Sequence, residues 1–199
     1  ERRQFAPTPP LPTYLLAMAV GPYDVVSGPA IPANDVRRAP IPLRGLAIKG
    51  KGPQLAYALG RIGPVVSALE GYFGTPYPFA KIDVMAAPAF SAGAMENAGL
   101  ILYREPLLLL DDKAGASRKR DYLLTTTHEL AHQWFGNLVT PRWWDDIWLN
   151  EAFATWMGDR VVEALHPEWH AEIQFLAGVE GAMSQDALVS ARRIREPIA

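Results

Sequence analysis

Cysteine is absent from all 199 residues of the sequence. Disulfides, iron–sulfur clusters, cysteine zinc sites and a cysteine nucleophile are therefore excluded. The compartment stays open, because a chain without cysteine folds in either redox environment. A long apolar run is also lacking, and the longest one, Tyr14–Val20, is far shorter than the roughly 20 residues of a membrane-spanning helix.

The sequence has no excess of basic residues either. Lysine and arginine number 19 and aspartate and glutamate 21, which leaves a net charge of −2. This balance argues against electrostatic binding to a nucleic acid. Hydrophobic residues make up 49% of the chain and charged residues 20%, a composition that excludes a disordered segment. At about 150 residues per domain, the length predicts one domain, or one domain with a small extra piece.

The order of patterns along the chain predicts an α+β fold, with strands first and helices after them. Strands are expected at Thr13–Val20, Tyr23–Ser27, Pro40–Lys49, Lys81–Ala87 and Ala98–Arg104. Apolar residues at spacings of three and four predict helices over Pro53–Phe73, Ser117 to about Phe135, about Leu149–Leu165 and about Glu168–Leu188. We therefore expect a sheet lobe with one helix over residues 1–110 and a helical lobe over residues 111–199.

The most informative segment is His128-Glu129-Leu130-Ala131-His132. Residues four apart on a helix share one face, about 5–6 Å apart at Cβ, so both imidazoles can reach one Zn²⁺. Glu129 lies one step round the helix, where it can accept a proton from a water molecule on the metal. A catalytic zinc needs three protein ligands and one open position. Glu151, at the start of the next predicted helix, is the expected third ligand.

Other interpretations of these residues stay open at this point. The motif can belong to a surface helix with two solvated histidines, or to a structural zinc site, which normally has four protein ligands. His166 and His170 have no partner at ligand spacing, and we interpret them as surface residues. Thr155, one helical turn after Glu151, is a candidate for orienting a metal ligand.

Two motifs together resemble a known enzyme family. Gly93-Ala94-Met95-Glu96-Asn97 is followed, after thirty residues, by the segment 128–137 and then by Trp148-Leu149-Asn150-Glu151. This combination is similar to the zinc aminopeptidases related to aminopeptidase N, which are gluzincins. The opening segment 8–16 resembles the start of that family's catalytic domain. The resemblance covers nearly the whole chain, and the pair of motifs is far more specific than either one alone.

The resemblance implies a thermolysin-like catalytic domain, with a small twisted sheet followed by a helical lobe that binds one Zn²⁺. It also implies an enzyme that removes single residues from peptides with a free N-terminus. Glu96 matches the family residue that binds the substrate's α-amine, and an internal peptide would leave this carboxylate unpaired. Gly93 and Ala94 would offer backbone groups to the peptide, and we assign Met95 and Asn97 to the same substrate-binding motif.

One departure from the family pattern concerns the oxyanion. The family has a tyrosine donor downstream of the third ligand, but only 48 residues follow Glu151 and none of them is tyrosine. The family's flanking domains are also missing from this sequence, which starts at Glu1 rather than at methionine. We therefore expect a piece of a longer enzyme. Loss of one oxyanion donor typically costs about 10²–10³ in turnover, so the chain alone is expected to be weakly active or inactive.

Two other functions are alternatives to the aminopeptidase interpretation. The first is another zinc hydrolase of the same architecture, such as an endopeptidase or an epoxide-opening enzyme. The second, from a different class, is a non-catalytic zinc-stabilised or peptide-binding module. If cleavage requires a free N-terminal amine, the aminopeptidase is distinguished from the first rival. Only an aminopeptidase would use Glu96 to bind that amine.

Overall fold

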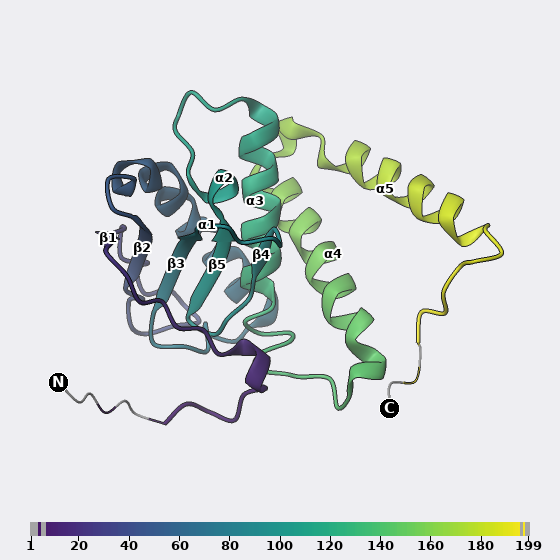
Figure 1. Ribbon diagram of the computed structural model, residues 1–199, viewed down its shortest axis with the longest axis horizontal. Coiled ribbons are helices and arrows are strands. Elements are labelled where there is room, and N and C mark those ends of the chain that lie inside the picture. Colours follow the sequence, from purple (N-terminus) through teal and green to yellow (C-terminus); the bar gives the residue numbers. More distant parts are fainter. Residues whose placement is uncertain (1–3, 5–6, 196, 198–199) are drawn as a thin grey trace.

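The computed structural model of the chain describes residues 4, 7–195 and 197. Its centre is a mixed five-stranded sheet in the order β1-β2-β3-β5-β4 (Figure 1). The outer pairs β1–β2 and β5–β4 are antiparallel, whereas β2–β3 and β3–β5 are parallel. The strands are β1 (Tyr23–Ser27), β2 (Leu43–Ile48), β3 (Ile82–Ala87), β4 (Ala94–Met95) and β5 (Leu100–Arg104). This arrangement puts the very short β4 at one edge of the sheet.

Five α-helices accompany the sheet in the described part of the chain. They are α1 (Ala56–Phe73), α2 (Glu105–Leu108), α3 (Ala116–Ala131), α4 (Ile147–Leu165) and α5 (Ala171–Asp186). Short 3₁₀ segments occur at Thr13–Leu15, Gly52–Leu55, Trp144–Asp146 and Pro167–Trp169. Helix α1 joins β2 to β3, as a crossover between parallel strands requires. The predicted α+β class is confirmed.

The helices α3 and α4 form the part of the fold that positions the site. They run antiparallel beside β4, while α5 extends away from the rest of the molecule (Figure 1). Gly158 allows the close packing of the pair, because a Cβ at this position would lie 3.3 Å from the Leu124 carbonyl oxygen. On the other side, α1 buries its predicted apolar stripe, including Leu59, Ile62 and Val66, in the core. Helix α1 thus packs against both α3 and α4, and β4 packs against α3.

The expected strand Thr13–Val20 is wrong. Thr13–Leu15 is a short 3₁₀ helix, and residues 16–20 form no strand. Leu16, Met18 and Val20 are exposed by 69%, 95% and 93%. The segment is apolar, but no neighbouring strand among the described residues hydrogen-bonds to it, so it has no sheet face to bury.

The other predicted elements are present, β1 with its predicted bounds and the rest with shifted ends. Helix α3 begins after Gly115 and ends at Ala131, short of the predicted Phe135, because the chain turns sharply before Gly136. Gly136 has a φ of +130°, a backbone conformation that favours glycine. Helix α5 begins at Ala171 rather than Glu168, since His170 adopts the left-handed conformation and separates it from the preceding turn. Among the described residues, no helix is both long enough and apolar enough to cross a membrane.

Candidate metal centre and active site

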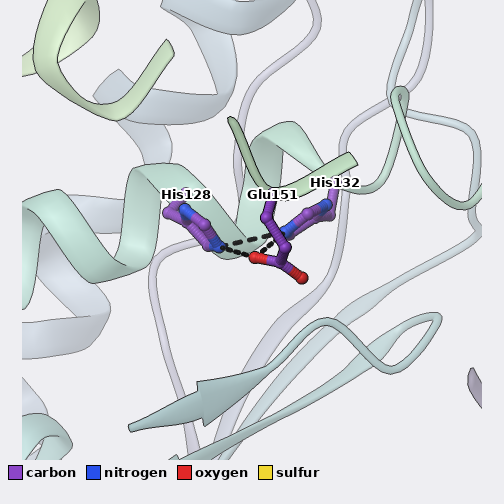
Figure 2. A group of neighbouring side chains, drawn as sticks. All are labelled: His128, His132 and Glu151. Atoms are coloured by element: carbon purple, nitrogen blue, oxygen red, sulfur yellow. Dashed lines mark hydrogen bonds and ion pairs between the residues drawn. The ribbon is translucent and has the colours of Figure 1, made fainter. Parts of the chain in front are cut away.

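Three predicted ligands converge between α3 and α4. His128 lies in the last turn of α3, His132 is the residue that caps the C-terminal end of this helix, and Glu151 lies in the second turn of α4. The Nε2 atoms of the two histidines are 3.0 Å apart, and Glu151 Oε2 lies 3.1 Å from that of His128 and 3.6 Å from that of His132. The three side chains point toward one another (Figure 2). Glu151 lies 23 positions after His128 in the sequence, and the packing of α4 on α3 brings the two side chains together.

The spacing of these atoms fits a single metal ion. Ligands about 2.0–2.1 Å from a tetrahedral Zn²⁺ lie roughly 3.3 Å from one another, which falls inside the observed range of 3.0–3.6 Å. His128, His132 and Glu151 are also the one group of His, Asp or Glu side chains within the described residues that can hold a metal ion. Glu129 does not belong to this group, so its carboxylate is left for another role.

Each histidine has a second contact that orients its ring. Thr155 Oγ1 lies 3.3 Å from Nδ1 of His128, and the carbonyl oxygen of Phe135 lies 3.3 Å from Nδ1 of His132. Metal-binding histidines commonly hydrogen-bond through the nitrogen that does not bind the metal. These contacts leave both Nε2 atoms directed at the common point, and Thr155 occupies the position that the sequence predicted for it.

The charges of the site hold Glu151 ionised. Hydrogen bonds with His128 and His132 keep the pKa of Glu151 far below its ordinary value, against the opposing effect of burial. Burial alone would lower the pKa of His132, but its hydrogen bond with Glu151 and the charges of Glu96 and Glu129 outweigh this and raise it. The cluster therefore carries excess negative charge close to two imidazoles, which favours a cation between them.

Glu129, next to the ligand His128 in the sequence, is almost completely shielded from solvent. The residue is only 5% exposed, and its Oε2 is buried without a hydrogen-bond partner in the described part of the chain. Burial raises the pKa of Glu129 to about 8; the charges of Glu96 and Glu151 add to this effect, and that of His132 opposes it. A carboxyl group whose pKa is near neutral can both accept and release a proton.

The segment 93–97 lies against α3 and forms the sheet side of the site. Ala94 and Met95 make up the edge strand β4, and the Gly93 carbonyl accepts a hydrogen bond of 2.9 Å from the Arg104 amide. The Glu96 carbonyl accepts hydrogen bonds from the side-chain amides of Gln133 (3.0 Å) and Asn137 (2.9 Å). These bonds fix Glu96, which is 5% exposed, next to the helix that carries the histidines.

Asn97 and Tyr14 connect the site to the start of the chain. The Asn97 side-chain amide donates to the Tyr14 carbonyl at 3.4 Å. The Tyr14 hydroxyl is buried without a partner among the described residues, and burial, followed by the charges of Glu96 and Glu151, raises its pKa to about 12. Sequence reasoning missed Tyr14 as a neighbour of the site, since no local spacing relates it to a motif more than a hundred residues away.

The comparison with known families agrees with this geometry. Residues 57–199 match the peptidase family M1 domain. The chain belongs to peptidase family M1. The predicted family resemblance is therefore confirmed, and because M1 peptidases are metallopeptidases, the His128, His132 and Glu151 group of this M1 chain is a candidate metal site.

Curated relatives share this sequence over nearly its whole length. The M1 chain is 43% identical over 192 residues to "Aminopeptidase M1-B" of Oryza sativa subsp. japonica, covering 96% of the chain and 21% of that protein. It is 41% identical over 197 residues to "Aminopeptidase N" of Homo sapiens (98% and 20%) and 41% identical over 187 residues to "Endoplasmic reticulum aminopeptidase 1" of Rattus norvegicus (94% and 19%). The chain thus spans about a fifth of the length of the curated relatives it matches.

Proposed function

We propose that this M1 chain carries the metal site and the amine-binding site of a zinc aminopeptidase, which removes single residues from the free N-terminus of peptides. The observation that carries the proposal is the convergence of His128, His132 and Glu151 beside an unpartnered, buried Glu129. The relatives named aminopeptidases support the same activity.

Zinc is the metal that suits this donor set best. Two imidazoles and one carboxylate with a position left open are typical of catalytic zinc sites, and no thiolate is present to favour a softer metal. When bound, Zn²⁺ supplies a Lewis acid for the scissile carbonyl and lowers the pKa of a water to about 7. His128, His132 and Glu151 would hold it.

Glu129 acts in this proposal as the general base. It accepts a proton from the attacking water and then gives that proton to the leaving amine. The lack of a hydrogen-bond partner on Oε2 among the described residues leaves the acceptor atom available for this proton.

Glu96 binds the α-amine of the substrate in this proposal. The main-chain carbonyl of Glu96 is anchored by Gln133 and Asn137, which holds this part of the segment 93–97 beside the C-terminal end of α3. The edge strand β4 can pair with an extended peptide through Gly93 and Ala94, with Met95 and Asn97 completing the segment. An internal peptide bond would leave the Glu96 carboxylate unpaired, which disfavours endopeptidase cleavage.

A donor for the oxyanion completes the proposed mechanism. No tyrosine follows Glu151 in this sequence, whereas the family resemblance implies one downstream of that ligand. We therefore propose that full activity requires residues beyond this chain, and that the chain by itself turns substrate over about 10²–10³-fold more slowly. Experiments on activity accordingly use the complete gene product that contains the chain.

The test of Glu129 is Glu129→Gln in the complete gene product, assayed with alanine 4-nitroanilide. Zinc content should stay at one per chain while kcat falls by at least about 10³-fold. Asp112→Asn, in an exposed loop, serves as the control and should behave as wild type. Retained turnover in Glu129→Gln would remove Glu129 from the mechanism.

Two further measurements distinguish the rivals. N-acetylation of the alanine substrate should abolish cleavage, because the acetylated amine carries no charge for Glu96; equal cleavage of both forms would favour an endopeptidase. Dialysis against a chelator should abolish activity, and added Zn²⁺ should restore it. A zinc-loaded protein that cleaves neither substrate would instead support the non-catalytic module.

A further inference from the structure

A hollow adjoins His128 and Glu129, toward the N-terminal end of α3. It has a volume of about 330 Å³ and is lined, among others, by Ala94, Thr125, His128, Glu129, Thr155 and Asp159. Residues from β4, α3 and α4 thus meet around it. Because Glu129 and His128 form part of its wall, any group in this hollow lies next to the reacting atoms.

The direction of a bound peptide relative to this hollow follows from α3. Glu96 is held by Gln133 and Asn137, which come after His132 in the chain. The hollow is instead lined by Leu124 and Thr125, which come before His128. Along α3, the hollow therefore lies closer to the N-terminal end of the helix than the residues that hold the Glu96 carbonyl. A peptide whose amine bound Glu96 and whose scissile bond lay at Glu129 would therefore direct the side chain of the residue after that bond toward the hollow.

Asp159 is the one acidic side chain of this hollow apart from Glu129. It is partly buried and has neither a hydrogen bond nor an ion pair within the described residues. Its neighbour Arg160 pairs instead with Glu163, at 3.7 Å. Burial raises the pKa of the Asp159 carboxyl, since no cation offsets the cost of removing it from water. A cationic group that entered the hollow would supply that missing partner.

The length of a basic side chain matches the distance from the metal ligands to Asp159. Thr155 lies beside the predicted metal ligands, because its hydroxyl is 3.3 Å from Nδ1 of His128. Asp159 is four residues further along α4, a rise of about 6 Å. Lysine carries its charge on a flexible four-carbon stem and arginine on a stem of similar reach. Both can therefore place their charge at Asp159 while their backbone stays beside Glu129.

We propose that Asp159 makes this site select peptides whose second residue, the one after the cleaved bond, is lysine or arginine. The proposal rests on the proposed aminopeptidase function. It adds a specificity-determining residue that none of the sequence motifs includes. Leucine or glutamate in the second position should be disfavoured, the first because it leaves Asp159 unpaired and the second because it adds a like charge.

The experiment compares three peptide amides, Ala-Lys-Gly, Ala-Leu-Gly and Ala-Glu-Gly, with the zinc-loaded complete gene product, and measures alanine release. The wild type should give a kcat/KM for the lysine peptide about tenfold above that for the leucine peptide, the effect of one charge-assisted bond. In Asp159→Asn this ratio should fall to about one. In Asp159→Lys the glutamate peptide should become the best of the three. Asp112→Asn makes the same chemical change in an exposed loop and should keep the wild-type ratio.

Two comparisons keep the outcomes distinct. If the wild type cleaves neither alanine 4-nitroanilide nor any of the peptides, the proposed function fails. If it cleaves them but shows no preference for lysine, or keeps that preference in Asp159→Asn, the assignment of Asp159 is overturned. Should Asp159→Asn fold poorly, Asp159→Ser replaces it, and Asp159→Glu should restore the lysine preference because it restores the charge. Loss of the preference in Asp159→Glu as well as in Asp159→Ser would show that the carboxylate charge does not determine it.

Discussion

Gly136 and Asn150 lie so close together that Gly136 has no room for a side chain. A Cβ on Gly136 would come within 2.4 Å of Asn150 Oδ1 and 3.1 Å of His132 Nδ1. Gly136 belongs to the turn that follows α3, and Asn150 immediately precedes the ligand Glu151. The contact therefore links the turn that follows His132 to the residue that precedes Glu151. A substitution at Gly136 should alter the positions of both predicted ligands.

Gly136→Ala is expected to weaken metal binding and to lower stability. The φ of +130° strains any residue other than glycine, at a cost of about 1–3 kcal/mol, and displacement of Asn150 would move Glu151. Zinc affinity should fall by about 10–100-fold, the range seen when the supports of metal ligands are altered. Competition with a chromogenic chelator measures the affinity, and thermal unfolding measures the stability.

The matched control for this substitution is Gly60→Ala. Gly60 lies in the middle of α1 at an exposed position, where an added Cβ meets nothing within 4 Å. Alanine should stabilise the helix there by about 0.5–1 kcal/mol and leave zinc affinity unchanged. Wild-type zinc affinity in Gly136→Ala would show that the close contact with Asn150 does not position the ligands.

Thr155→Val is expected to weaken zinc binding without unfolding the protein. Valine keeps the branched shape but removes the hydroxyl that lies 3.3 Å from His128 Nδ1. Loss of such a support typically lowers metal affinity by about tenfold or more. Thr155→Ser keeps the hydroxyl and should keep near-wild-type affinity. If valine and serine give equal affinities, the hydroxyl does not orient His128.

The buried pair of Arg37 and Glu70 is expected to dominate the stability of the region behind the site. Glu70 is fully buried and accepts hydrogen bonds from Arg37 Nε (2.8 Å), the Asn34 side chain (2.6 Å) and the Tyr77 amide (2.9 Å). Arg37→Met leaves the carboxylate without its charge partner, which should cost about 3–5 kcal/mol.

Denaturant unfolding of the complete gene product measures this loss. The double variant Arg37→Met/Glu70→Gln removes both charges and should recover part of the stability lost in the single variant. A double variant that is less stable than the single one by the full cost of Glu70→Gln would show that the two charges do not interact.

Stability should depend on pH through Asp83. Burial alone would raise the pKa of Asp83, but hydrogen bonds and charges from Arg44 and Lys81 outweigh it and lower the pKa below the ordinary value. A carboxylate with a lowered pKa stabilises the folded state above the unfolded-state pKa of about 3.9. That stabilisation is lost as the pH falls through the folded-state pKa. Asp83→Asn should therefore be less stable than wild type at pH 7 and approach it below about pH 4.

Thermal unfolding between pH 7 and pH 3 measures the Asp83 contribution. The comparison of wild type with Asp83→Asn removes the effect of every other titrating group. Asp112→Asn, at an exposed loop position, should differ from wild type by the same small amount at each pH. A difference between wild type and Asp83→Asn that does not change with pH would contradict the lowered pKa.

Local periodicity predicted the helices well and the isolated strand poorly. Helix α1 matches its apolar stripe because that stripe is buried against the core. The apolar run in Thr13–Val20 predicted a strand, but a strand also needs a hydrogen-bonded neighbouring strand, and the segment has none among the described residues. In β3, apolar Ile82 alternates with charged Asp83 in the sequence, yet all six residues of the strand are buried. Asp83 is tolerated there because Arg44 and Lys81 pair with it.

The sequence by itself determined that His128, Glu129 and His132 share one region of a helix, because the pitch of an α-helix sets the positions of residues one and four apart. Only the tertiary structure decided that Glu151 meets both histidines, that Thr155 contacts His128 and that Asp159 faces the same hollow as Glu129. Those relations depend on how closely α4 packs on α3. That distance is set by side chains far apart in the chain, so no local pattern can contain it.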